Sequence, residues 1–359
     1  MSATTEHLII RADATHAMGT GHLMRCLALA QSWREIHEGR VTFITLCKSL
    51  GLLRRIVDAG FEVKTLKASY PDEGDLDSTL ASLNAKPTDT WLVLDGYHFD
   101  SDYQRRIKEA GHLLLAIDDL NHLGHYYADI VVNQNIYARS LEYSCEPYTQ
   151  LLLGTEYALL RQEFTSRDSV QREIAPVARK ILVTLGGSDP CNQTMKVLRA
   201  LLSLDMPGLE AKIVIGSSNP RLDEIREAAE SADSSIAIGI IVDAPDMAAL
   251  MAWADVGVTG AGSTCWELGF MGLPALLIVL ADNQTGIASG LEEAGTAINL
   301  GWHYELTESA IARELALLLR DSSRRSDMSE KGRRIVDGQG CQRVSSTLSR
   351  QDAPVQITG

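Results

Sequence analysis

The sequence has few cysteines and a minority of basic side chains. Its six cysteines are spread over 359 residues without a C-x-x-C pair, so we expect reduced thiols and a cytoplasmic protein. The 33 lysines and arginines are outnumbered by 47 aspartates and glutamates, which gives a formal net charge of −14. This balance argues against nucleic acid or an anionic membrane as the main partner, because both need a basic surface. A small anion could still bind through backbone amides.

Long hydrophobic runs are also missing. The longest uncharged apolar stretch, LGFMGLPALLIVLA at 268–281, is too short to cross a bilayer and contains glycine and proline. The first residues show no basic flank followed by an apolar segment, as a secretory signal would. We therefore expect no membrane insertion and no secretion.

Several common catalytic and cofactor motifs are absent or incomplete. The stretch GTGHLM at 19–24 lacks the third glycine of a dinucleotide fingerprint, and the strand expected next ends at Cys47 and Lys48 without a ribose-binding acid. The phosphate-loop pattern G-x-x-x-x-G-K-[ST], G-x-S-x-G and H-E-x-x-H do not occur. The histidines of HLGH at 122–125, with the aspartates of IDDL, are interpreted as solvated turn residues rather than metal ligands. The sequence thus predicts no cofactor and no bound metal.

What is present is a regular alternation of short apolar runs and amphipathic segments. The runs are apolar on both faces, as expected of strands buried in parallel sheets, and the alternation is typical of βαβ units. They cover 7–13, 41–47, 91–97, 113–119, 129–135 and 151–154 in the first half, and 180–189, 210–218, 234–242, 254–262 and 273–281 in the second.

The polar segment at 165–179 divides these two series and carries no strand, which is typical of an interdomain linker. We therefore predict an α/β protein with two Rossmann-like, doubly wound domains, at 1–164 and 180–349, facing a cleft, and a flexible tail at 350–359. Open α/β sheets bind ligands at the carboxyl ends of their strands.

Glycine-rich turns at such strand ends predict a phosphate site in the second domain. GAGSTCWELGFMGLP and GGSDP each follow a predicted strand, where free backbone N–H groups can hold phosphate oxygens, and LADNQ follows another strand. The candidate residues are Gly186, Gly187, Ser188, Asp189, Gly262, Ser263, Thr264, Glu267, Asn283 and Gln284. Thr264 and Glu267 alone also fit a capping box, which would leave the glycines unexplained.

A set of stretches running in order from about residue 11 to residue 301 carries a family resemblance. They are RADATHAMGTGHLMRCLALA, VLDGYHFD, IDDL with ADIVVNQN, LLLGTEYALLRQEF, LGGSDPCNQT and AGSTCWELGFMGLPALLIVLADNQ. Through them the chain resembles the family that includes the UDP-sugar hydrolase of pseudaminic acid biosynthesis and spore-coat polysaccharide proteins. Its members are similar to the B-type (GT-B) glycosyltransferases, notably the peptidoglycan UDP-N-acetylglucosamine transferase.

The resemblance implies that the C-terminal domain holds UDP and the N-terminal domain holds the sugar. It also implies metal-independent hydrolysis of UDP-2,4-diacetamido-2,4,6-trideoxy-β-L-altrose to UDP and the free sugar. The expected partner is therefore a UDP-sugar substrate, and the oligomeric state is left open.

By the same resemblance His22 is the catalytic residue, a base that activates water. At the positive end of a helix its imidazole should be neutral and able to accept a proton. UDP is already a good leaving group, so a second, acidic carboxyl is less necessary than in ordinary glycosidases, and we expect inversion at the anomeric carbon. A lone histidine at a helix start can also be purely structural.

The expected sugar-side residues are Asp13, Gly19, Gly21, Arg25, Asp95, Tyr97 and Asn133. The two glycines would let the backbone approach the sugar. Either Asp13 or Asp95 could orient His22, bind sugar hydroxyls, or act as a cap or turn residue. Arg25 could pair with a carboxylate or reach the pyrophosphate.

Three functions are compatible with these residues: a nucleotide-sugar hydrolase, a glycosyltransferase of the same fold, and a noncatalytic nucleotide-sugar binding protein. The first two share a UDP site and differ in the acceptor. The histidine within an intact GTGHLMR argues against the third.

Overall fold

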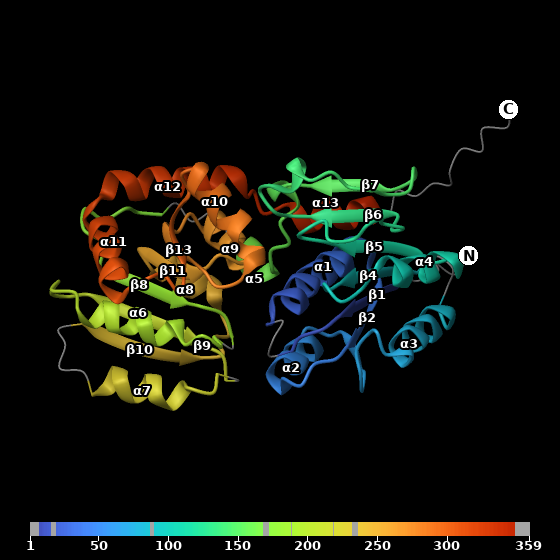
Figure 1. The fold of residues 1–359 in the computed structure, drawn as a ribbon, viewed down its shortest axis with the longest axis horizontal. Helices are drawn as coiled ribbons and strands as arrows, with labels where there is room; N and C mark the ends of the chain where they lie inside the picture. Colours follow the sequence, from blue (N-terminus) through green and yellow to red (C-terminus); the bar gives the residue numbers. More distant parts are fainter. Residues whose placement is uncertain are drawn as a thin grey trace. The chain divides into compact units, whose positions relative to one another are not determined.

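A computed structural model describes residues 7–15, 19–86, 90–167, 172–187, 189–217, 219–231 and 236–348. The chain divides into two units. Unit 1 comprises Met1–Thr15, His22–Gln162 and Gly338–Gly359, and unit 2 comprises His16–Gly21 and Glu163–Asp337. Each unit is built on one parallel sheet covered by helices (Figure 1).

The sheet of unit 1 has the strand order β3-β2-β1-β4-β5-β6-β7. Its strands are β1 (His7–Ala12), β2 (Arg40–Thr45), β3 (Glu62–Thr65), β4 (Trp91–Asp95), β5 (Leu113–Ile117), β6 (Ile130–Asn133) and β7 (Gln150–Leu153). Its helices are α1 (Gly21–His37), α2 (Leu50–Asp58), α3 (Glu73–Asn84), α4 (Ser101–Glu109) and α13 (Gly340–Leu348), with the 3-10 turns η1 (Ala138–Ser140) and η2 (Thr155–Tyr157).

Burial on both faces explains the continuous apolar runs of this sheet. Along β1, Leu8 and Ile10 pack in one hydrophobic cluster with α1, whereas Ile9 packs in a second cluster with Tyr103 of α4. Because successive side chains of a strand point to opposite faces, both faces of β1 need apolar residues.

The sheet of unit 2 has the order β10-β9-β8-β11-β12-β13. Its strands are β8 (Lys180–Thr184), β9 (Glu210–Ile215), β10 (Ala237–Val242), β11 (Val256–Gly260), β12 (Ala275–Val279) and β13 (Ala297–Trp302). Its helices are α6 (Gln193–Leu202), α7 (Leu222–Glu230), α8 (Met247–Trp253), α9 (Thr264–Met271), α10 (Thr285–Glu293), α11 (Glu308–Arg320) and α12 (Ser322–Ile335), and the 3-10 turn η3 (Asp282–Gln284) precedes α10. The short helix α5 (Gln162–Thr165) begins at the last residue of unit 1 before the chain enters unit 2.

In both sheets the strand order reverses at a central pair, β1/β4 in unit 1 and β8/β11 in unit 2. This is the doubly wound topology, whose ligand sites lie beyond the carboxyl ends of the central strands. The predicted fold class, two doubly wound α/β domains, is confirmed. Two edge strands were not predicted: β3 has mostly exposed polar residues, and β13 is only half-buried, so neither carries a continuous apolar signal. Asp95 therefore ends the fourth strand rather than the third.

The last helix, α13, belongs to unit 1 and not to the C-terminal domain in which the sequence placed it. Cys341, Val344 and Leu348 pack in the hydrophobic cluster that contains β1 and α1, and Trp91 Nε1 donates to Leu348 O at 3.0 Å. In Figure 1 this red helix lies among the blue and green elements of unit 1. The spacing of the three apolar residues predicts a helix but does not say which sheet it covers.

The predicted linker also differs from the structure. Its described residues are 165–167 and 172–179, and the second stretch is attached to unit 2: Arg172 donates to Met251 O at 2.6 Å, and Ala175 O accepts from Arg325 at 2.8 Å. The predicted flexible tail at 350–359 lies outside the described residues.

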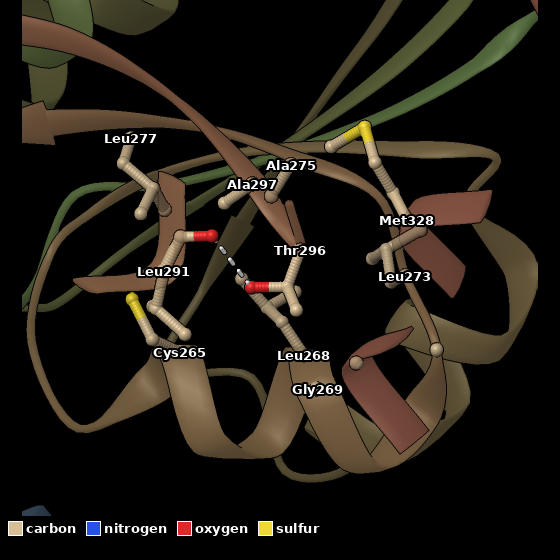
Figure 2. Close-up of a pocket in the computed structure, with 12 residues that line it drawn as sticks. Cys265, Leu268, Gly269, Leu273, Ala275, Leu277, Leu291, Thr296, Ala297 and Met328 are labelled. Carbon is tan, nitrogen blue, oxygen red and sulfur yellow. Dashed lines mark hydrogen bonds between the residues drawn. The ribbon is translucent and has the colours of Figure 1, made fainter. Parts of the chain in front are cut away.

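Helix α9 is held against the rest of unit 2 by close backbone packing. A Cβ at Gly332 of α12 would lie 3.2 Å from Gly269 O, so glycine allows the two helices to approach. A small pocket beneath α9, drawn in Figure 2, is lined mainly by apolar side chains, and the Thr296 hydroxyl there donates to Leu291 O at 3.0 Å. We interpret it as packing space that positions α9, since that hydroxyl is already paired.

The docking of α13 can be tested at its first residue. A Cβ at Gly340 would overlap the backbone of Ala158, so Gly340→Ala should lower the free energy of unfolding by about 1–3 kcal/mol. Gly124→Ala is the matched control, because a Cβ there meets nothing within 4 Å. Differential scanning calorimetry of both variants checks this, and equal unfolding temperatures would contradict the described docking.

Candidate active site

The carboxyl end of β4 brings His22 and Asp95 together. Asp95 is the last residue of β4 and His22 lies in the first turn of α1; His22 Nδ1 is 2.6 Å from Asp95 Oδ1. An ionised carboxylate can only accept, so Nδ1 carries a proton in this contact, and Nε2 is the ring nitrogen that a neutral imidazole would leave free to accept one. Asp95, rather than Asp13, is therefore the residue that orients His22.

Arg25, one helical turn beyond His22, pairs with two carboxylates. Its Nε and one terminal nitrogen donate to the two oxygens of Asp95, each at 2.7 Å, and its other terminal nitrogen donates to Asp119 Oδ1 at 2.8 Å. All three nitrogens are thus engaged with carboxylates. This resolves the alternative left open by the sequence in favour of carboxylate pairing.

Asp119 is the centre of a second set of hydrogen bonds. Tyr97 Oη donates to its Oδ2 at 2.7 Å, Asn135 Nδ2 donates to its Oδ1 at 3.0 Å, and Tyr137 Oη donates to its backbone oxygen at 3.0 Å. Asp95 pairs with Ile117 in the sheet register, which places Asp119 just beyond the neighbouring strand end. The residue was missed by the sequence prediction, although a polar pair directly after a buried strand was a usable signal.

The neighbouring Asp118 is buried as well, so the interpretation of this pair as solvated turn residues is wrong. Asp118 is 2 % exposed and Asp119 is 7 % exposed. Asp118 accepts from Tyr143 Oη at 2.7 Å and lies 3.0 Å from His122 Nδ1. His122 remains partly exposed.

The charges of this cluster are mutually stabilised. Burial by itself raises the pKa of the Asp95 carboxyl, but Arg25 and His22 hold it well below its usual range. Asp119 behaves in the same way: burial raises its pKa, and the Arg25 guanidinium outweighs that effect. Both carboxyls are therefore ionised at neutral pH, and Arg25 is permanently charged.

The ring of Tyr97 lies edge-on to two imidazoles. Its centroid is 5.0 Å from that of His22, with an interplanar angle of 82°, and 5.9 Å from that of His122. Tyr97 thereby links the His22 group to the loop that follows β5. It is half-buried, as are Gly19 and Gly21, whereas the other predicted sugar-side residues are buried.

Asp13 lies at the end of β1 in a separate buried network. Its side chain is 0 % exposed and accepts from Arg11, Ser69 and the Leu46 amide, while His98 Nε2 lies 3.2 Å away. Because these partners already occupy both oxygens, Asp13 has a structural role in this conformation. It is not brought to His22.

Asn133 also has its partners within the chain. It donates to Tyr143 Oη at 2.9 Å and accepts from the Asn135 amide at 3.0 Å. Its side chain therefore supports the loop around Asp118 and Asp119. Gly19 has a φ of +74°, a conformation that favours glycine whatever lies nearby, and Gly21 is the first residue of α1.

In unit 2 the GGSDP turn is packed tightly. A Cβ at Gly216, after β9, would overlap Gly187 O, so Gly216 permits the close approach of this turn. Gly186 has a φ of +88°, and Ser188 lies outside the described residues. The Asp189 carboxylate accepts from the amides of Gln193 and Thr194 at 2.9 and 2.7 Å, so it caps α6 rather than facing a ligand.

The GAGST turn leads into α9 with Ser263 at the N-cap, where its side chain makes no capping hydrogen bond. Thr264 is the first helical residue, so the capping box with Thr264 as the cap is not formed. Within the described ranges the Ser263 and Thr264 amides make no backbone hydrogen bond. Glu267 lies in the first turn of the same helix.

The predicted segment LADNQ at 280–284 lies beside the GAGST turn. Gln284 accepts from the Leu280 amide at 3.0 Å, and its Nε2 lies 3.9 Å from the position of a Cβ on Gly262. Asn283 precedes it in η3. The structure thus brings the Gly262 turn and Gln284 together at the carboxyl edge of the unit 2 sheet.

Three further features of the chain concern metal ligands, membrane spans and cysteines. In the part of the chain that the structure describes, no group of three or more histidine, cysteine, aspartate or glutamate side chains is arranged to hold a metal ion. No described helix combines the length and the apolar character that a membrane crossing requires. All six cysteines are free thiols.

Comparisons with known proteins agree with this architecture. The model of the glycosyltransferase family 28 C-terminal domain matches residues 180–339. A crystal structure of MurG from Acinetobacter baumannii superposes with a TM-score of 0.69, covering 96% of this chain and 99% of that chain at 16% identity. The chain has the GT-B fold.

Among curated sequences, the spore coat polysaccharide biosynthesis protein SpsG of Bacillus subtilis is 26% identical over 346 residues, 95% of this chain and 97% of SpsG. A UDP-2,4-diacetamido-2,4,6-trideoxy-beta-L-altropyranose hydrolase of Campylobacter jejuni is 25% identical over 80% of this chain and 97% of that protein. The uncharacterized protein MJ1062 of Methanocaldococcus jannaschii is 30% identical over 77% of this chain, and the alignment spans only 56% of MJ1062.

The buried network around Asp13 predicts acid lability. Burial raises the pKa of the Asp13 carboxyl, but His98, Arg11 and Ser69 together hold it well below its usual range. A carboxyl with a depressed folded-state pKa stabilises the fold fully above its unfolded pKa of about 4, and this stabilisation is lost as the pH falls further. Asp13→Asn should lower the free energy of unfolding at pH 7 by about 3 kcal/mol and flatten its fall below pH 4.

Urea unfolding between pH 3 and 7 measures this effect. The control is Asp102→Asn, which removes an exposed ion pair with Arg105 and should change the free energy of unfolding by less than about 1 kcal/mol. Parallel pH curves for the wild type and Asp13→Asn would show that Asp13 does not stabilise the fold in this way.

Proposed function

We propose that this protein hydrolyses a UDP-linked diacetamido-trideoxy sugar, UDP-2,4-diacetamido-2,4,6-trideoxy-β-L-altrose, to UDP and the free sugar, a step of pseudaminic acid biosynthesis. The observation that carries the proposal is the contact between His22 Nδ1 and the buried Asp95 carboxylate at the carboxyl end of β4. The similarity to the Campylobacter jejuni hydrolase supports the choice of substrate. The free cysteines favour a reducing compartment such as the cytoplasm.

In this proposal His22 Nε2 takes a proton from water while the water oxygen bonds to the anomeric carbon and the bond from that carbon to the UDP oxygen breaks. Asp95 holds the imidazole in the tautomer that can accept the proton and stabilises the imidazolium that forms. UDP leaves with the bonding electron pair and needs no proton from the protein. Attack opposite the leaving group gives the inverted anomer.

The UDP end of the substrate is assigned to unit 2. The amides at the start of α9 carry the positive end of the helix dipole and suit a pyrophosphate, with Gly186, Gly187, Gly262 and Gln284 beside them at the same sheet edge. Glu267 is proposed to accept hydrogen bonds from the ribose hydroxyls. The match of residues 180–339 to a glycosyltransferase domain supports this assignment.

A glycosyltransferase with a UDP-sugar donor is the second candidate, favoured by that domain match and by the similarity to MurG. It would use the same base on an acceptor hydroxyl instead of water. A noncatalytic binding protein has less support, because it would not need a carboxylate-oriented histidine.

The discriminating experiment is release of UDP without an acceptor, followed by NMR across a panel of UDP-sugars. UDP and a free sugar of inverted anomeric configuration are expected. Turnover only on addition of an acceptor would establish the glycosyltransferase instead, and an initial product of retained configuration would exclude direct attack by water.

The role of His22 is tested by His22→Asn. Asparagine is tolerated at a helix start and can still donate to Asp95, so the fold should persist while kcat falls by roughly 10²- to 10⁴-fold. KM should change little, because the base acts on the transition state. The wild-type rate should fall as the imidazole is protonated at low pH, and the variant should lose that dependence. Near-normal turnover would remove His22 from the mechanism.

The UDP assignment is tested by Glu267→Ala. Loss of charge-assisted hydrogen bonds to the ribose should weaken UDP binding by about 1–3 kcal/mol. Isothermal titration with UDP measures the affinity, with exposed Glu227→Ala on α7 as the matched control and His22→Asn expected to bind normally. Unchanged affinity in Glu267→Ala would leave that carboxylate without a role in ribose binding.

A further inference from the structure

We propose that Asp119 is a positioning residue that, through Arg25 and Tyr97, sets the charge state and the surroundings of the His22 imidazole. Its catalytic meaning rests on the function proposed above, but its effect on His22 does not. The sequence prediction of site residues did not include this aspartate.

The first argument is connectivity. Asp119 contacts Arg25 directly, and Arg25 contacts both oxygens of Asp95, which in turn holds His22 Nδ1. The guanidinium is planar and rigid, so its contact to Asp119 and its two contacts to Asp95 are geometrically coupled. The position of the His22 partner is thereby tied to the loop after β5.

The second argument is a count of charges. With His22 neutral, the described groups around it carry two negative charges, from Asp95 and Asp119, and one positive charge, from Arg25. Protonation of His22 makes this cluster neutral. Without Asp119, the positive charge of Arg25 would cancel the negative charge of Asp95. Asp119 adds a second negative charge, and it therefore favours the imidazolium form that a general base must reach.

The other titratable groups that face this cluster do not change the count. Burial raises the pKa of the Cys26 thiol, which donates to Asp95, and also raises the pKa of Tyr137, so both stay neutral. The Tyr97 hydroxyl donates to Asp119. The centroid of the His122 ring is 5.9 Å from that of Tyr97, and its Nδ1 lies 3.0 Å from its own carboxylate, Asp118.

The third argument is the geometry of Tyr97. Its hydroxyl donates to Asp119 Oδ2, and its ring meets His22 edge-on. One carboxylate therefore holds, through separate oxygens, the guanidinium behind His22 and the aromatic ring beside it. Loss of Asp119 should disturb both at once.

The test is an NMR titration of the His22 imidazole in isotope-labelled full-length protein, with His22→Asn used to assign its signals. Asp119→Asn should move the His22 titration midpoint down by on the order of one pH unit, because it removes one of the two negative charges that offset Arg25 around the imidazole. Asp119→Glu keeps the charge and should restore most of the midpoint. Arg25→Gln should move it up, which gives an independent variant if Asp119→Asn does not fold.

The matched control is Asp129→Asn. Asp129 is as buried as Asp119, at 7 % exposed, but its partners are Lys108 and the Leu114 amide, so the His22 midpoint should not move. A folded Asp119→Asn protein, or a folded Arg25→Gln protein, with an unchanged midpoint would overturn the proposal. An equal shift in Asp129→Asn would also overturn it, because the effect would then not be specific to this network.

Activity gives a separate readout. In a working hydrolase, Asp119→Asn should move the acidic limb of kcat/KM to lower pH in step with the NMR midpoint and should lower kcat by about 10-fold or more through misplacement of the base. Movement of the NMR midpoint with no UDP release from the wild-type protein would support the role of Asp119 and refute the proposed function.

Discussion

The guanidinium of Arg25 is the interaction on which the functional part of unit 1 depends. Two carboxylates buried at neighbouring strand ends repel one another and lose their hydration. Both effects would be strongly unfavourable without a cation between the carboxylates. Arg25 is placed one turn into α1, so its pairing with Asp95 and Asp119 also fixes the first turn of that helix over β4 and β5. The orientation of His22 is a result of this pairing.

In both units the candidate site residues lie at the carboxyl ends of the central strands, but their chemistry differs. In unit 1 the residues at the ends of the central strands are ionised side chains that pair with one another and hold an oriented imidazole. In unit 2 the corresponding turns contain glycines, and their main functional groups are backbone amides. The proposed function uses the first sheet edge to move a proton and the second to bind an anion.

The sequence was sufficient for the fold because buried parallel strands are apolar on both faces, as β1 and β11 are. It could not separate Asp13 from Asp95, since both follow strands that meet at the same edge. Their difference arises from partners distant in the chain, Arg11 and Asp75 for the first network and Arg25 for the second. Asp119 was overlooked because a pair of aspartates in a polar loop resembles a turn until Arg25, 94 residues earlier, is placed against it.

The return of α13 means that unit 1 is not a continuous stretch of the gene. A protein ending near residue 164 would lack the helix that covers Trp91 and the cluster around α1, and would expose apolar surface there. Exchange of the part of unit 2 at Glu163–Asp337 between relatives, in the laboratory or in evolution, would need two junctions rather than one. The segment that precedes α13 would have to be replaced while α13 itself is kept with the unit it covers.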